Sequence, residues 1–218
     1  FLIYGFVVGM TAGFTVLTAQ KFGAGDMEGM RKTVVGAGVL SFVIGTILTI
    51  LFMVFMKPLL ILMNTPSDIF ADSYAYIMIV SGGILAQMLY NLLSSILRAL
   101  GNSKLPLYFL IISAILNIFG DLFFVIVLKA GSNGCAISTV LSEALCCLFC
   151  IIYIQKKVPI LRLGKKWLVF DARLLKKTIA YGWASAMQQA TVQMGKIAIQ
   201  ALVNTMGVSV AAAFAVVN

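Results

Sequence analysis

Residues 106–154 read PLYFLIISAILNIFGDLFFVIVLKAGSNGCAISTVLSEALCCLFCIIYI, which is two apolar runs joined by a short polar connector. Each run approaches the ~20 residues that cross a bilayer as a helix. Polar side chains interrupt them: Asn117 and Asp121 on the first run, Thr139 and Glu143 on the second. A spacing of four places each pair on one helix face. In a hairpin centred on the connector, Asp121 should lie at the depth of Thr139, and Asn117 deeper, level with Glu143.

Two carboxylates inside a membrane require a reason. Insertion scales put the cost of one charged side chain near the bilayer centre at about 2.5–3.5 kcal/mol. Asp121 follows Pro106 by about 15 residues, or roughly 23 Å of helix, which places it in the outer half of the membrane. We therefore predict an ion or proton site of a transporter at Asn117, Asp121, Thr139 and Glu143. The alternative is a structural carboxylate bonded to its neighbours.

The composition indicates an integral membrane protein. The 218 residues are 61% hydrophobic and 11% charged, with a mean hydropathy of +1.06. Histidine, the commonest metal ligand and general base, is absent. The four cysteines, at 135, 146, 147 and 150, do not have the spacing of paired metal ligands, and we expect small, buried, reduced side chains. Both ends fall inside apolar runs, which suggests a fragment of a longer protein. Residues 1–19 lack the basic start and the cleavage site of a signal peptide, so we interpret them as a span.

Six full apolar spans and the start of a seventh are predicted. They cover residues 1–19, 33–56, 73–97, 106–128, 134–154 and 179–204, with 207–218 beginning the next. We expect helices, because lipid offers the backbone no hydrogen-bond partners. The prolines, at 58, 66, 106 and 159, should all lie at span ends or in connectors.

Basic residues set the expected orientation. Connectors 20–32, 98–105 and 155–178 carry thirteen lysines and arginines, whereas the opposite connectors carry only Lys57 and Lys129. The positive-inside rule places the basic side in the cytoplasm. The net charge of +9 is therefore a topology signal and does not indicate nucleic-acid binding. Residues 155–178 are either an interfacial segment or an ordinary basic loop, and they are the best candidate boundary between two bundles.

Small and polar residues recur at helical spacing elsewhere. Gly5, Gly9 and Gly13 form a ladder that favours close helix packing, or a hinge between helices. A second polar face carries Gln87, Asn91 and either Ser94 or Ser95, and ends at Arg98; a third carries Ser185, Gln189, Gln193, Lys196, Gln200 and Asn204. Such stripes avoid lipid. We predict a water-filled substrate cavity lined by Gln87, Asn91, Gln189, Gln193, Lys196 and Gln200, with bonding between helices as the alternative.

Lys196 has two interpretations of equal weight. It could offset an intramembrane carboxylate, or it could extend outward to the membrane surface from the outer half of its helix.

Four segments, in order, resemble the multidrug and toxic compound extrusion (MATE) transporters. They are Ala19-Gln-Lys-Phe-Gly-Ala-Gly-Asp26, Leu97-Arg-Ala-Leu-Gly-Asn-Ser-Lys-Leu-Pro106, Leu116-Asn-Ile-Phe-Gly-Asp121, and Gly182-Trp-Ala-Ser-Ala-Met-Gln-Gln189 with Gln200-Ala-Leu-Val-Asn204. The resemblance implies an all-α membrane fold, which in the whole protein has twelve helices in two six-helix lobes. This chain would hold family helices 2–6 in residues 1–155, a cytoplasmic inter-lobe linker in 156–178, and helix 7 with part of helix 8 in 179–218.

The resemblance also implies a function. Members export drugs and organic cations in exchange for Na⁺ or H⁺, and Asn117, Asp121 and Thr139 match the positions that bind the coupling ion, the one metal ion expected. A first-helix acidic residue of that site would precede this chain. The chain departs from the common family pattern at four positions. Leu122 and Ala184 stand where proline is common, Glu143 where glutamine is common, and Lys196 where a neutral polar residue is common. Glu143 and Lys196 could form a pair.

We therefore expect a cation-coupled efflux antiporter working by alternating access, monomeric and multi-pass in the plasma membrane. It should need no cofactor beyond its coupling ion, act on drug-like or cationic small molecules, and bind no nucleic acid. The first alternative is a lipid-linked saccharide flippase of the same superfamily, to which only Lys196 points. An intramembrane enzyme is disfavoured because histidine and a nucleophile–base spacing are absent, and a channel because no filter loop repeats.

Overall fold

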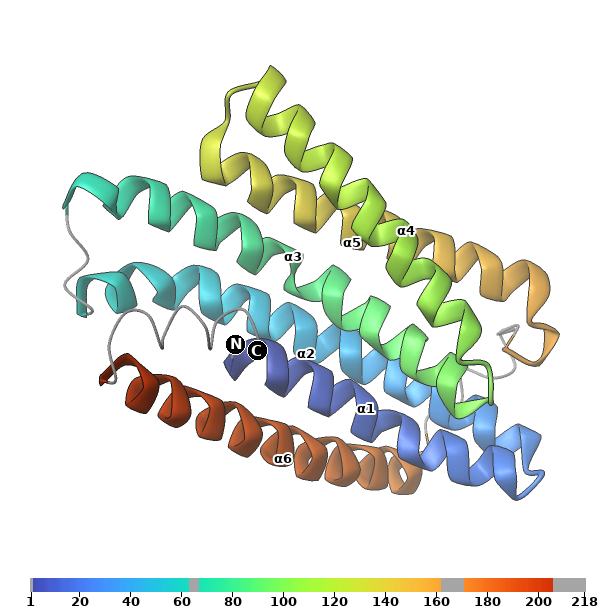
Figure 1. Cartoon of the computed structure of the whole chain (residues 1–218). Helices are drawn as coiled ribbons and strands as arrows, with labels where there is room; N and C mark the ends of the chain where they lie inside the picture. The colour runs from blue at the N-terminus through green and yellow to red at the C-terminus, as the bar shows by residue number, and fades with distance from the viewer. Residues whose placement is uncertain (1, 63–66, 162–170, 206–218) are drawn as a thin grey trace.

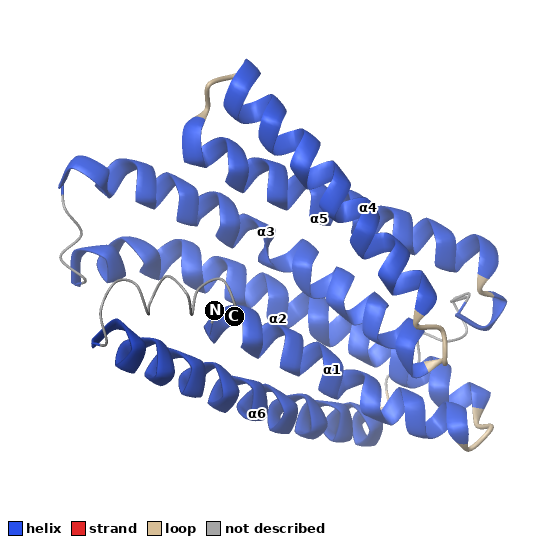
Figure 2. Ribbon diagram, in the orientation of Figure 1, coloured by secondary structure: helices blue, strands red, loops and turns tan. Residues whose placement is uncertain are grey.

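The structure is a computed structural model that describes residues 2–62, 67–161 and 171–205. In this part of the chain every regular element is helical (Figure 2). The elements are α1 (Leu2–Gly23), α2 (Met27–Leu62), α3 (Ser67–Ala99), α4 (Lys104–Leu122), a π-helical turn η1 (Phe123–Val127), α5 (Gly131–Lys157), a 3₁₀ turn η2 (Pro159–Leu161) and α6 (Ala172–Thr205).

The six predicted spans are confirmed as helices, and several helices extend beyond the predicted bounds. α2 continues through Pro58, which was expected outside the span. α6 begins at Ala172 and so takes up the end of the predicted 155–178 connector. The fourth span finishes in the π-helical turn η1 and not in α-helix. The expected seventh span, 207–218, and Pro66 lie outside the described residues.

Four of the described helices are long and apolar enough to cross a membrane: α2, α3, α4 with η1, and α5. α1 and α6 run alongside them (Figure 1), and their crossing stays a prediction. The C-terminal ends of α1, α3 and α5 lie at one end of the bundle, and those of α2 and α4 at the other. The chain therefore alternates in direction as expected, with the described parts of the predicted basic connectors at one end.

The bundle is built around α1 and α3. α6 packs along α1, α2 contacts both α1 and α3, and α5 packs on α3 and carries α4 on its other side. Fully buried side chains, including Phe14, Met30, Met88 and Leu92, fill the space between α1, α2 and α3. α4 is the most peripheral helix, since its only buried residues are Pro106 and Phe109.

The glycine ladder of α1 lies directly against α6. A Cβ on Gly9 would come within 2.6 Å of the Ser185 carbonyl oxygen, and one on Gly13 would collide with the backbone at Tyr181. A Cβ on Gly5 would meet the side chain of Gln193. The ladder is therefore a packing surface, as predicted, and it brings α1 into backbone contact with α6.

Several buried threonines of α1 and α2 have hydrogen-bond partners within the bundle. Thr11 Oγ1 donates to the Val7 carbonyl oxygen at 3.0 Å, which returns its hydrogen bond to its own helix. Thr18 Oγ1 donates to Thr33 Oγ1 at 3.2 Å, and Thr33 Oγ1 donates to the Met30 carbonyl at 2.7 Å. The chain Thr18–Thr33–Met30 joins α1 to α2 without leaving a buried hydroxyl unpaired.

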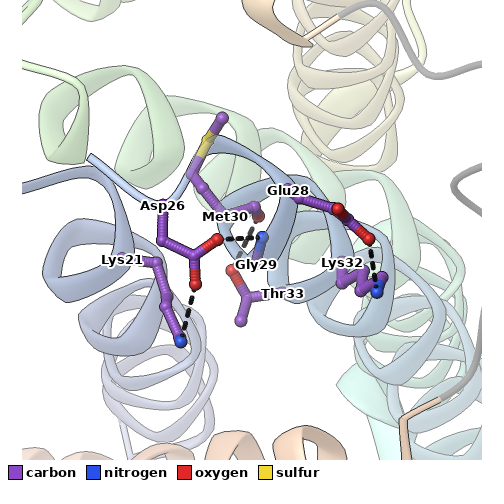
Figure 3. A network of polar contacts seen from close by, with 7 residues as sticks. All are labelled: Lys21, Asp26, Glu28, Gly29, Met30, Lys32 and Thr33. Atoms are coloured by element: carbon purple, nitrogen blue, oxygen red, sulfur yellow. Dashed lines mark hydrogen bonds and ion pairs between the residues drawn. The ribbon is translucent and has the colours of Figure 1, made fainter. Parts of the chain in front are cut away.

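An ion pair closes the turn between α1 and α2 (Figure 3). Gly25 takes a φ of +73°, which glycine adopts readily, and Asp26 then caps α2 by accepting the Gly29 N–H at 2.8 Å. Lys21 Nζ binds the other Asp26 oxygen at 2.8 Å. The hydrogen bond from Lys21, and then that from Gly29, hold the pKa of the Asp26 carboxyl below its ordinary value of 3.8.

The beginning of α2 also holds both ends of the segment between α5 and α6. Arg31 Nε donates to the Ile160 carbonyl oxygen at 2.9 Å, and Leu161 beside it is buried. Asp171 caps α6 through the N–H groups of Arg173 and Leu174. Of the predicted connector 155–178, only residues 162–170 lie outside the described part. The two interpretations of this connector, an interfacial segment and an ordinary basic loop, both stay predictions.

The α1–α6 contact can be tested with one glycine and a matched control. Gly13→Ala should lower stability by about 1–3 kcal/mol, because its methyl meets backbone that cannot move aside. Gly38→Ala, in α2 with open space at its Cα, should be neutral or stabilising. Thermal unfolding of the full-length protein in detergent measures both. Equal melting temperatures for the two variants would contradict the packing described.

The Lys21–Asp26 pair should make stability depend on pH. Because the pKa of Asp26 is lowered by folding, its contribution is present above pH 3.8 and lost as pH falls through the lower, folded value. Lys21→Met should therefore lower the melting temperature slightly at neutral pH, and the difference should shrink in acid. Lys177→Met, at an exposed position near the start of α6, is the control. A Lys21→Met difference that persists unchanged in acid would argue against the pair.

Candidate ion-binding site

Small residues bring α4 and α5 into close contact. A Cβ on Gly120 would overlap the Ser138 hydroxyl, and one on Gly134 would come within 2.9 Å of the Phe124 Cβ. Both contacts are centred on residue 129, one position before the predicted centre. The hairpin therefore forms as expected, with a slightly different register.

Asn117 is the centre of a hydrogen-bond cluster between the two helices. Its Nδ2 donates to Thr139 Oγ1 at 3.1 Å and lies 3.4 Å from Ser138 Oγ. Ser138 Oγ donates to the Asn117 carbonyl oxygen at 3.0 Å, and Thr139 Oγ1 donates to that of Cys135 at 2.9 Å. Asn117 and Thr139 are thus brought together, and Ser138 joins them.

Asp121 lies one turn beyond Asn117 and is half-buried. Its Oδ1 is shielded from solvent and has no hydrogen-bond partner among the described residues. The structural alternative, a carboxylate bonded to Asn117 and Thr139, is therefore not what the structure shows. A buried carboxylate oxygen without a donor needs a proton or a cation, because an isolated charge in apolar surroundings is costly.

Glu143 does not join this cluster. The predicted pairing of Asn117 with Glu143 is wrong: Asn117 contacts Thr139, and Glu143 turns toward α3, where Gln87 Nε2 donates to its Oε1 at 3.2 Å. α5 contacts both α4 and α3, and Glu143, one turn farther from the connector than Thr139, takes its partner from α3.

The predicted cavity residues divide between two places. Gln87 and Asn91 lie on α3, where Asn91 Nδ2 donates to the Gln87 carbonyl oxygen at 2.9 Å. Gln189 and Gln193 lie on α6 and pack against the glycines of α1. α1 contacts both α3 and α6, whereas the described parts of α3 and α6 do not contact each other. Part of the α6 stripe thus serves helix packing, the alternative considered from sequence.

The remaining stripe residues are more open. Lys196 is exposed and Gln200 is half-buried. The salt bridges of the described residues are Lys21–Asp26 and Lys32–Glu28, so neither a Lys196–Glu143 pair nor a Lys196–Asp121 pair forms in this structure. Whether these residues line a cavity in the whole protein stays a prediction.

All four cysteines are free. Cys146, Cys147 and Cys150 are buried as predicted, whereas Cys135 is half-buried. Within the described ranges no three histidine, cysteine or acidic residues gather as a metal site.

Two features of this region were missed from the sequence. Ser138 is a full member of the Asn117 cluster, and η1 follows Asp121 directly. Gly120 and Gly134, one on each side of the hairpin connector, indicate close packing in the sequence. They could have prompted a search for a small polar residue opposite Gly120. The π-helical turn has no comparable signal. Such turns are often found at functional sites.

The helical architecture and apolar surface define a multi-pass α-helical membrane protein, and comparisons place it in a family. The MatE family model matches residues 1–123. The chain therefore belongs to the MatE family of transporters.

Curated relatives and a solved structure agree with this assignment. The probable multidrug resistance protein YoeA of Bacillus subtilis (strain 168) is 30% identical over 227 residues, covering 100% of this chain and 49% of YoeA. The probable multidrug resistance protein YpnP of the same organism is 32% identical over 231 residues, covering 99% of this chain and 48% of YpnP. The chain thus spans about half the length of these relatives. The crystal structure of a MATE in complex with MaD3S has the same fold, with a TM-score of 0.89, 22% identity, and coverage of 98% of this chain and 49% of that one.

Ser138 provides a direct test of the α4–α5 cluster. Ser138→Ala removes the hydroxyl that bonds Asn117 and should lower stability by about 0.5–1.5 kcal/mol. Ser132→Ala, at an exposed position in the first turn of α5, should change stability by less than about 0.5 kcal/mol. Thermal unfolding of the full-length protein compares them. A Ser138→Ala protein as stable as the control would show that the cluster contributes nothing measurable.

Proposed function

We propose that the full-length protein is a cation-coupled efflux antiporter for drug-like or cationic small molecules, a transporter and not an enzyme. Membership of the MatE family and the names of the YoeA and YpnP relatives support this class. The observation that carries the coupling is the buried, unpartnered Oδ1 of Asp121. A monomer in the plasma membrane, facing the cytoplasm with its basic connectors, is the arrangement we propose.

The proposed ion-binding residues are Asn117, Asp121 and Thr139, and we propose that Glu143 also takes part in ion coupling. Asn117 uses its amide nitrogen to bond Thr139, which leaves its amide oxygen as a ligand beside the Asp121 carboxylate. Hard cations such as Na⁺ are bound through oxygen atoms of this kind, and a proton would bind Asp121 directly. Either ion would supply the partner that the Asp121 oxygen lacks.

Transport would use relative motion of two lobes, residues 1–155 and 179–218, joined by the 156–178 linker. Under this division the contact between the α1 glycines and α6 is a contact between lobes. Substrate would bind the polar residues Gln87, Asn91, Gln189, Gln193, Lys196 and Gln200 when the lobes separate. Coupling requires that substrate affinity differ between the ion-loaded and ion-free states.

Efflux measurements test this proposal. Cells producing the full-length protein should extrude a fluorescent organic cation, driven by an imposed Na⁺ or pH gradient, and Asp121→Asn should abolish the gradient-driven part at normal membrane abundance. Asp72→Asn, the same change at an exposed position on α3, is the matched control.

Two other outcomes of the efflux measurement would contradict parts of this proposal. Unchanged efflux by Asp121→Asn would assign Asp121 a structural role. Absence of efflux in the unmodified protein would overturn the antiporter proposal and favour lipid-linked substrates.

A further inference from the structure

Glu143 occupies a second polar position in the α4–α5 region, distinct from the Asn117 cluster. It is half-buried on α5 and accepts a hydrogen bond from Gln87 on α3. Asn117 bonds Ser138 and Thr139 instead, so the two clusters share no hydrogen bond. We infer that Glu143 and Gln87 form a separate proton-binding site that links α3 to α5.

The surroundings of Glu143 favour a proton over a fixed positive charge. Within the described chain, no lysine or arginine forms a salt bridge with it. The nearest cation on α3 is Arg98, eleven positions or about 16 Å along the helix from Gln87, and it binds Ser95. An ionised Glu143 would therefore be a charge without a counter-ion in an apolar bundle, and a proton would neutralise it.

The other helices supply no counter-charge. Lys104, at the first residue of α4, is the cation of that helix, and its second charged residue is Asp121, which is acidic. Titratable groups that share the α3–α5 contact include Tyr90 on α3 and Cys146 and Cys150 on α5. None of the three is a cation. The described part of α6, which carries Lys196, does not contact α5.

Gln87 is suited to a group that gains and loses a proton. A side-chain amide carries both donors and an acceptor. When Glu143 is ionised, the Gln87 N–H donates to its Oε1, as the structure shows. When an aqueous proton binds a Glu143 oxygen, the new O–H can donate to the Gln87 amide oxygen after the amide turns over. The contact between α3 and α5 is kept in both states, which a lysine partner could not do.

The site lies close enough to Asp121 to be coupled to it. Glu143 is one turn from Thr139 on α5, and Asp121 is one turn from Asn117 on α4. Thr139 and Asn117 are hydrogen-bonded at 3.1 Å, so the two carboxylates lie one turn to either side of one contact. A cation bound at Asp121 would favour ionised Glu143, and a proton on Glu143 would lessen repulsion around an empty Asp121. This coupling rests on the proposed function; proton binding by Glu143 does not.

Infrared difference spectroscopy of the full-length protein in lipid, titrated between acidic and alkaline buffer, tests the proton site without transport. A protonated carboxylic-acid C=O band should disappear in alkali, shift in deuterated buffer, and be lost in Glu143→Gln. It should persist in Asp121→Asn, in which Glu143 is unchanged. Gln87→Leu should keep the band but move it to higher wavenumber, because the hydrogen bond is lost.

The alternatives are distinguishable. In the Asp121→Asn background, where Asp121 cannot contribute, a band that survives the further change Glu143→Gln would overturn the inference. The absence of any titrating carboxylic-acid band in the unmodified protein would overturn it as well. Should Glu143→Gln fail to fold, an unshifted band in Gln87→Leu would overturn it equally. Efflux lost in Asp121→Asn together with an unchanged spectrum in Glu143→Gln would leave the antiporter standing and remove only the second site. Titration of Glu143 in a protein without efflux would leave the proton site standing and remove the antiporter proposal.

Discussion

The rest of the structure depends on one constraint, the absence of hydrogen-bond partners in the lipid interior. It forces the backbone into helices, and it favours partners within the bundle for buried side-chain donors. Thr11 returns its hydrogen bond to its own helix, Thr18 finds Thr33 on the next, and Asn117 finds Ser138 and Thr139. Five buried side-chain atoms of the described residues lack a partner, and Asp121 Oδ1 is the carboxylate oxygen among them, so it is the one that a cation or a proton would satisfy.

Glycine decides which helices approach closely enough to exchange these bonds. Gly120 and Gly134 let α4 meet α5, and the α1 ladder lets α6 lie against α1. In lipid, association relies on such packing because apolar side chains gain little by leaving the acyl chains. The polar stripe of α6 therefore need not face water along its whole length: Gln189 and Gln193 cover glycines. The same contact would have to open or slide if the lobes move, and its small residues make that change of packing less costly than separation of interlocked large side chains.

The sequence was sufficient to predict the helices, their alternation and the hairpin of α4 and α5. Hydropathy and loop charge determine the first two, and the short connector determines the third. The hairpin prediction set Asp121 opposite Thr139, whereas Asn117 bonds Thr139 in the structure. The sequence was insufficient for Glu143. Symmetry about the connector relates only α4 and α5. The partner of Glu143 comes from α3, and the position of α3 around α5 depends on side-chain packing such as that of Gly83 against Val140. The register error of one residue and the π-helical turn after Asp121 arise from packing in the same way.

Peripheral packing of α4 gives the Asp121 site its particular character. The buried residues of α4 both lie in its first two turns, and η1 has none, so the outer half of this helix is held mainly by its contact with α5. α5 is in turn fixed to α3, with the Gln87–Glu143 bond across that contact. An ion at Asp121 would therefore add its binding energy where the helix is least constrained. A change there can move α4 at low energetic cost while α3 and α5 stay in place. A coupling site requires this difference in rigidity between one helix and its neighbours.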